Sequence, residues 1–278
     1  MWWKYNHRTG QGTVLCHIIE PSPVLYQFRR SQDEKISFLY AYLYLIVYFF
    51  SFTSLAEDSL IMSADALFEK GDINSILESI PLYIKAVEAN PNDYETNWKC
   101  ARAHREYANL AFQQEIEGWE DICKKYGKDG MNYGKKAIEL MPEKIDGHYW
   151  YGVSAGTYSD GVSILKALKE GLKKSTENAF ETSYAMDKMY EDGGPMLCLG
   201  RFWHQLPFPM KNKKRALGYF EEFQKYFPDD PQGQVFYAEL LIDMREKTLA
   251  KPFLEKAAAS DHPYYSKRAK ELLEEKYK

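Results

Sequence analysis

The chain has 278 residues, of which 45% are hydrophobic and 15% aromatic, and its formal charge at pH 7 is −4. This length and apolar content are enough for one large or two modest folded domains, and no long low-complexity tract interrupts the chain. An acidic balance, without a stripe of lysine and arginine between aromatic residues, argues against nucleic acid as a partner.

The N-terminal part of the chain reads as a leader rather than as part of the fold. Residues 1–34 show neither helical nor strand periodicity, so we expect an extension that is disordered or absent from the native protein. The uncharged run 36–50 follows basic residues, and Ser54 and Ala56 fit a small-x-small cleavage site. This predicts a signal peptide over 35–56 and a periplasmic or secreted protein. An uncleaved membrane anchor is the alternative, although the run is shorter than the roughly 20 residues of a spanning helix.

The remainder, residues 57–278, has helical periodicity throughout, with apolar residues at positions i, i+3 and i+4. Similar turn signals recur along it, and their equivalent positions are 51, 46, 40 and 35 residues apart. These positions are Pro91, Pro142, Lys188, Pro228 and Pro263. The spacing converges on the period of about 34 residues of the tetratricopeptide (TPR) repeat. The sequence therefore predicts a single all-α domain, a TPR-like solenoid of helical hairpins.

Additional residues fall between the two helices of each hairpin, mainly in the second and third units. Because they continue the helical pattern, we expect lengthened helices there, with one long helix from Trp98 to Tyr126. Insertions at the same place in each repeat lie along one edge of a solenoid, where they add surface for a partner. The last residues, 264–278, have an apolar stripe and otherwise polar side chains, which predicts a C-terminal capping helix.

The stretch HYWYGVSAGTYSDGVSILKALK begins at His148 and combines large rings with small residues. It is open to two interpretations, a binding pocket or the packing face of a helical repeat. Gly152 and Gly156 favour a close approach of helices over a nucleotide-binding loop, because no strand precedes them. Tyr151 and Ala155 are expected in the core, where the helices of the hairpin cross.

The sequence contains no recognised catalytic motif such as GxSxG or HExxH, so we expect a non-enzymatic protein with no catalytic residues. The four cysteines form no CxxC pair and have no histidine at metal-ligand spacing, so neither a metal nor a cofactor is expected. Buried free thiols are the expected state of Cys100, Cys123 and Cys198, with a Cys100–Cys123 disulfide left open. His204 is expected to cap a helix or lie exposed.

Three segments resemble a known family. The first is the ring-rich stretch GHYWYGVSAGTYSDGVSILKALK, the second is YEDGGPMLCLGRFWHQLPFPM, and the third is KKRALGYFEEFQKYFPDDPQGQVFYAELLI. The second segment contains Asp192-Gly193-Gly194-Pro195, Leu199-Gly200-Arg201 and Leu206-Pro207. Over roughly residues 60–275 the chain resembles the T component (TatT) family of tripartite ATP-independent periplasmic (TRAP) transporters. Many such proteins are lipoproteins, and this chain departs from them because no cysteine stands at the cleavage point.

The resemblance implies a periplasmic homotrimer with a pore through each protomer, which docks with the transporter's solute-binding protein and passes a hydrophobic solute. The alternative is a general cell-envelope TPR scaffold that mediates protein–protein interactions without a solute. Arg201 is expected either to pair with an acidic residue of the neighbouring repeat or to hold an anion. The candidate partner- or solute-facing residues are His148, Tyr149, Tyr158, Arg201, Phe202, His204 and Phe208.

Overall fold

A computed structural model of the protein describes residues 59–277. The expected N-terminal extension, 1–34, and signal peptide, 35–56, lie outside the described residues. The residues described belong to one compact unit, Leu55–Lys278. Their regular structure is entirely helical. Within 59–277, no helix combines the length and the apolar character needed to cross a membrane.

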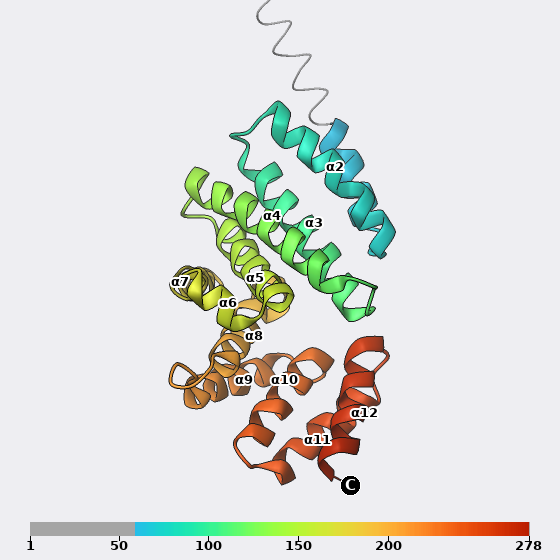
Figure 1. The fold of residues 1–278 in the computed structure, drawn as a ribbon, viewed down its shortest axis with the longest axis vertical. Helices are drawn as coiled ribbons and strands as arrows, with labels where there is room; N and C mark the ends of the chain where they lie inside the picture. The colour runs from blue at the N-terminus through green and yellow to red at the C-terminus, as the bar shows by residue number, and fades with distance from the viewer. Residues whose placement is uncertain (1–58, 278) are drawn as a thin grey trace, which may run out of the picture. The chain divides into compact units, whose positions relative to one another are not determined.

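The helices form hairpins that follow one another along the long axis of the view in Figure 1. A helix over 59–68 precedes α2 (Ile73–Ala89) and packs against it, and the next hairpin joins α3 (Tyr94–Gln113) to α4 (Trp119–Leu140). The later helices are α5 (Ile145–Val162), α6 (Ile164–Lys169), α7 (Leu172–Met186), α8 (Tyr190–Gln205), α9 (Lys213–Tyr226), α10 (Pro231–Asp243), α11 (Lys247–Ala258) and α12 (Pro263–Tyr277). The predicted all-α, TPR-like solenoid with a C-terminal capping helix is confirmed.

The predicted turns between hairpins share one contact. In three of them, a side chain six residues after the turn proline lies within hydrogen-bond distance of the carbonyl oxygen of that proline. The pairs are Asn97 with Pro91 at 3.2 Å, His148 with Pro142 at 2.8 Å, and Gln234 with Pro228 at 2.7 Å. The same contact at the same position shows that these three of the five predicted turns are structurally equivalent.

The expected continuous helix from Trp98 to Tyr126 is wrong. The chain leaves the helical conformation after Gln113 and returns to it at Trp119. Between them Glu115 and Gly118 adopt left-handed backbone, with φ of 53° and 75°, which ends one helix and reverses the chain. The insertion therefore lengthens both partners, and α3 and α4 have 20 and 22 residues.

Glycines set the distance between α4 and α5. A Cβ atom on Gly127 would lie 2.5 Å from the backbone nitrogen of Tyr158, and one on Gly134 would lie 2.8 Å from that of Tyr151. Such distances are closer than side-chain carbons tolerate, so these two helices pack backbone against backbone.

Of the two glycines expected to permit close helix packing, the structure confirms one. A Cβ on Gly152 would meet the ring of Phe180 of α7 at 2.6 Å. The same expectation for Gly156 is wrong, because no atom would lie within 4 Å of its Cβ. The core positions expected for Tyr151 and Ala155 are confirmed, since both side chains are buried.

Candidate binding groove

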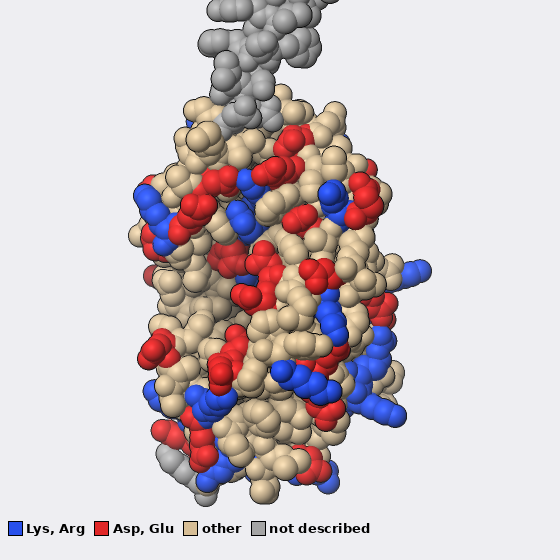
Figure 2. Space-filling model, turned by 180° about the vertical axis from the view of Figure 1, so that it is seen from behind, with Lys and Arg blue, Asp and Glu red and all other residues tan. Residues whose placement is uncertain are grey.

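A groove with a volume of about 690 Å³ lies along the inner face of the solenoid. Its walls come mainly from the first helix of successive hairpins, α3, α5, α8 and α10, and α6, α7 and α12 complete them. In helical repeat proteins, stacked helices create such extended concave surfaces for binding. On the side of the molecule seen in Figure 2, acidic side chains gather around a hollow in the surface.

The groove has an apolar floor built from one continuous part of the core. Tyr149, Trp150 and Val153 of α5 pack with Phe180 of α7, and Phe202 of α8 packs against this cluster. The ring of Tyr149 contacts that of Trp150 edge to face, at 5.0 Å between centroids. Most of the area of these side chains is buried within the core, and Phe202 is the most exposed of them, so the floor offers a small apolar surface to a partner.

Each cation that lines the groove already has a carboxylate partner. Arg105 donates to its neighbour Glu106. Lys173 Nζ lies 2.7 Å from Glu177 Oε2. Arg201 makes an equally direct contact, since its guanidinium lies 2.5 Å from a carboxylate oxygen of Glu239.

Three carboxylates in the groove have no such partner. Asp160 of α5 and Glu191 and Asp192 of α8 line the groove, are exposed, and make no hydrogen bond or ion pair with another described residue. Burial by the surrounding walls raises the pKa of Asp160 to about 6, against the lowering effect of Arg201 and Arg105. The Asp160 side chain is nevertheless exposed at the surface of the groove.

The two carboxylates on α8 are presented by unusual backbone. Glu191, Asp192 and Gly193 have φ of 46°, 52° and 79°, so three consecutive residues are left-handed. For residues other than glycine this conformation costs about 1–2 kcal/mol each, and it persists only where the surrounding structure enforces it. Close packing of Gly193 against the ring of Phe227 helps to fix the turn, since a Cβ there would lie 2.5 Å from that ring.

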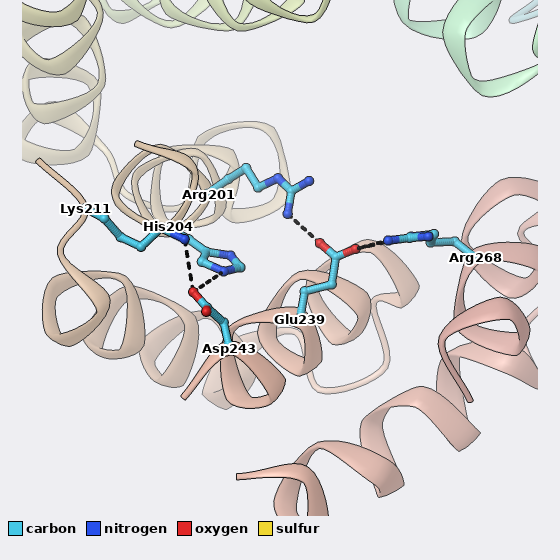
Figure 3. A network of polar contacts seen from close by, with 6 residues as sticks. All are labelled: Arg201, His204, Lys211, Glu239, Asp243 and Arg268. Atoms are coloured by element: carbon cyan, nitrogen blue, oxygen red, sulfur yellow. Dashed lines mark hydrogen bonds and ion pairs between the residues drawn. The ribbon is translucent and has the colours of Figure 1, made fainter. Parts of the chain in front are cut away.

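A pair of arginines around Glu239 joins α8, α10 and α12 beside the groove (Figure 3). Arg201 of α8 and Arg268 of α12 approach the Glu239 carboxylate from opposite sides, and Arg268 donates to it through Nε at 3.2 Å and Nη2 at 3.0 Å. Burial alone would raise the pKa of Glu239, but the two arginines lower it. The C-terminal helix also reaches the end of α3, where the rings of Tyr264 and Phe112 lie 5.5 Å apart.

We expect Glu239→Gln to lower the free energy of unfolding by about 2 kcal/mol, because it removes charge-assisted hydrogen bonds to two arginines. Glu271→Gln is the matched control, since Glu271 meets Arg268 at 3.7 Å with a side chain that is 45% exposed. Its effect is expected to stay below about 0.5 kcal/mol. Urea unfolding measures both variants, and equal effects would contradict a structural role for the Glu239 network.

The structure brings three of the seven sequence-predicted site residues to the groove, namely Tyr149, Arg201 and Phe202. Arg201 pairs with an acidic residue of the neighbouring repeat, Glu239, as one of the two interpretations expects. The other four residues lie elsewhere. His148 approaches the turn at Pro142, Tyr158 donates to Glu170, Phe208 is 93% exposed on the loop between α8 and α9, and His204 is buried.

His204 differs most from its expectation, because it is only 5% exposed rather than a surface or capping residue. It lies one residue before the end of α8 and faces α10, where its Nε2 is 3.5 Å from a carboxylate oxygen of Asp243 (Figure 3).

Sequence reasoning missed the three unpartnered carboxylates. Asp192 appeared only within a glycine-containing helix break, and Asp160 and Glu191 carried no signal. A pair of charged residues before Gly193, at the point where one helix is interrupted, is the local feature that could have indicated Glu191 and Asp192.

The cysteines agree with the expectation of free thiols. Cys100, Cys123 and Cys198 are unbridged, and the first two are buried. The fourth, Cys16, lies outside the described residues. Over 59–277, no cluster of histidine, cysteine, aspartate and glutamate has the arrangement of a metal site.

Comparison with known proteins relates the chain to regulators of microtubule dynamics. The model of the family described as "Regulator of microtubule dynamics protein 1-3" matches residues 60–202. Regulator of microtubule dynamics protein 1 of Bos taurus is 23% identical over 240 residues, which cover 78% of this chain and 69% of the relative. The Mus musculus protein of the same name is 22% identical over 239 residues, covering 78% and 72%.

Among solved structures, a thermophilic TPR protein of Thermus thermophilus matches with a TM-score of 0.56 and 15% identity. The match covers 78% of this chain and 98% of the other. At this identity the likeness establishes the fold alone.

These matches overturn the resemblance to the T component of TRAP transporters. The glycines among the residues that carried it serve packing needs common to helical hairpins. Gly200, for example, lets the ring of Phe220 approach, because a Cβ there would lie 2.5 Å from that ring. The docking to a solute-binding protein, the hydrophobic solute and the homotrimer were implied by that resemblance alone and fall with it.

The expected localisation is corrected for the same reason. A periplasm is a bacterial compartment, whereas the matched relatives are mammalian regulators of microtubule dynamics. The prediction of a periplasmic or secreted protein is therefore wrong.

Proposed function

We propose that this chain, which belongs to the regulator of microtubule dynamics protein 1-3 family, is a non-enzymatic scaffold that acts in the control of microtubule dynamics. In this proposal, a segment of a partner protein lies in the groove along the inner face of the solenoid. The family supplies the cellular process, and the groove supplies the mode of action.

The groove is the observation that carries the proposal. Its volume of about 690 Å³ is within the range of built binding sites, and it is lined by the first helices of successive hairpins. Its floor is aromatic and aliphatic, while charged side chains stand around it. An apolar centre with a polar rim is the usual composition of a protein–protein interface.

Filling the groove tests the proposal. Gly156 lines it, and a Cβ there would meet no atom within 4 Å, so Gly156→Trp is expected to place an indole in the groove without disturbing the helix packing. Gly218 of α9 is an equally open glycine that does not line the groove, and Gly218→Trp is the matched control.

In cells that lack the protein, the full chain and Gly218→Trp are expected to restore microtubule growth and shortening rates, and Gly156→Trp is expected not to. The melting temperatures of the two variants, measured on purified protein, should agree within a few degrees. Restoration by Gly156→Trp at normal expression would show that the groove is not the functional surface.

A further inference from the structure

We propose that the partner segment held in the groove is basic, with lysine or arginine side chains between apolar ones, and that Asp160, Glu191 and Asp192 receive these basic side chains. This inference rests on the proposed function and goes beyond it, because it names the chemistry of the partner.

The cations of the groove are paired, whereas three of its carboxylates are not. Arg105, Lys173 and Arg201 are each already satisfied by a carboxylate, so they offer little free positive charge. The three carboxylates have no such partner among the described residues. An anionic segment would meet cations that are already paired and carboxylates that repel it. A cationic segment would meet three carboxylates that make no ion pair with the rest of the described chain.

The carboxylates that line the groove also repel one another. Burial is the main cause that raises the pKa of Glu191. The positive charges of Arg102 and Arg105 lower it, and the negative charges of Glu106 and Asp192 raise it. Asp192 in turn acts on Asp230, another carboxylate of the lining, and raises its pKa. Carboxylates that act on one another in this way repel, and a bound cation relieves their repulsion.

The three carboxylates stand on the same helices that supply the apolar floor. Glu191 and Asp192 stand on the left-handed turn of α8, and Asp160 stands near the end of α5. Both helices also supply the floor, through Trp150 and Val153 on α5 and Phe202 on α8. A segment lying on this floor therefore has carboxylates within reach from two walls, which suits a chain that alternates apolar and basic side chains.

The test uses the full chain and short synthetic peptides that share a leucine and serine background. One peptide carries a pair of lysines, the second a pair of glutamines and the third a pair of glutamates. Fluorescence anisotropy measures each affinity. The lysine peptide is expected to bind about tenfold more tightly than the glutamine peptide, and the glutamate peptide more weakly than both. Added salt should narrow the difference, because the carboxylates are exposed.

The variant Asp160→Asn/Glu191→Gln/Asp192→Asn is expected to bind the lysine and glutamine peptides equally. A control with the same change in net charge is Asp121→Asn/Glu139→Gln/Glu143→Gln, at exposed carboxylates outside the groove. It should keep the tenfold preference. Gly156→Trp should weaken binding of the lysine and glutamine peptides alike.

The outcomes separate this inference from the proposed function. Equal binding of the three peptides by the parent chain, with loss of all three in Gly156→Trp, would overturn the basic partner and leave the groove as the binding site. A lysine preference that survives the triple groove substitution would also overturn the inference. Binding that Gly156→Trp leaves intact would count against the proposed function itself.

Discussion

Gly127→Ala is expected to lower the free energy of unfolding by about 3 kcal/mol, although it adds a single methyl group. The new Cβ would lie 2.5 Å from the backbone nitrogen of Tyr158 and 2.8 Å from its Cα. Backbone atoms cannot turn aside as a flexible side chain can, so α4 and α5 must separate. Their separation would open the packing over the whole length of the contact, which is why a large cost is expected.

A matched substitution at another glycine is expected to change the free energy of unfolding in the opposite direction. Gly218 is an exposed glycine of α9, and its Cβ would meet no atom within 4 Å. Gly218→Ala is therefore expected to raise the free energy of unfolding by about 0.5–1 kcal/mol through helix propensity alone. Urea unfolding of the parent and both variants measures the difference. A neutral or stabilising Gly127→Ala would contradict the backbone contact between α4 and α5.

The architecture was predictable because its signals are local. Turn prolines at equivalent positions, such as Pro91, Pro142 and Pro228, end one hairpin and begin the next, and each accepts the same contact from a side chain six residues later. The three glycines of α4 that face neighbouring helices, Gly127, Gly130 and Gly134, are also readable, since a spacing of three and four residues places them on one helix face.

The break between α3 and α4 was not predictable in the same way. It depends on left-handed backbone at Glu115, a residue type that normally continues a helix. Contacts far along the chain accompany it, since Lys267 of α12 lies 2.7 Å from the Glu115 carboxylate. Local propensity favours the helix, and tertiary structure overrides it.

The residues that line the groove could not be predicted from the sequence, because they depend on how the helices are arranged in the fold. Tyr149 and Tyr158 belong to the same helix and the same ring-rich stretch, yet one lines the groove and the other donates to Glu170. Aromatic spacing cannot distinguish these roles, because both positions face protein. The family resemblance failed for a related reason, since glycines such as Gly200 that mark close packing recur wherever two helices cross closely.

The second large effect is expected from His204, as a loss of stability below about pH 6.5. Its side chain is 5% exposed, and its pKa is lowered from 6.5 to about 4, chiefly by burial. The positive charges of Arg201 and Lys211 contribute to this lowering, and together with burial they outweigh Glu239 and Asp243, which raise the pKa (Figure 3). The folded protein therefore holds this imidazole neutral at a pH where the unfolded chain would protonate it.

The sign of the effect follows from proton binding. Between about pH 6.5 and pH 4 the unfolded state binds more protons at this position, so the free energy of unfolding falls as the pH falls. A pKa lowered from 6.5 to about 4 corresponds to about 3 kcal/mol over the full window. Burial also lowers the pKa of His104, which contributes in the same direction. Asp160 acts in the opposite direction, since a raised carboxyl pKa favours the folded state as the pH falls.

Urea unfolding at a series of pH values from 7.5 to 5 separates these contributions, in a range where most carboxylates stay ionised. The free energy of unfolding of the parent is expected to fall steadily below about pH 6.5, and that of His204→Gln to fall much less. Adding His104→Gln to His204→Gln is expected to remove the remaining dependence on pH. Asp160→Asn should steepen the loss instead. An identical slope in the parent and His204→Gln would show that this histidine is protonated as readily in the folded chain as in the unfolded one, and that the contact with Asp243 outweighs burial.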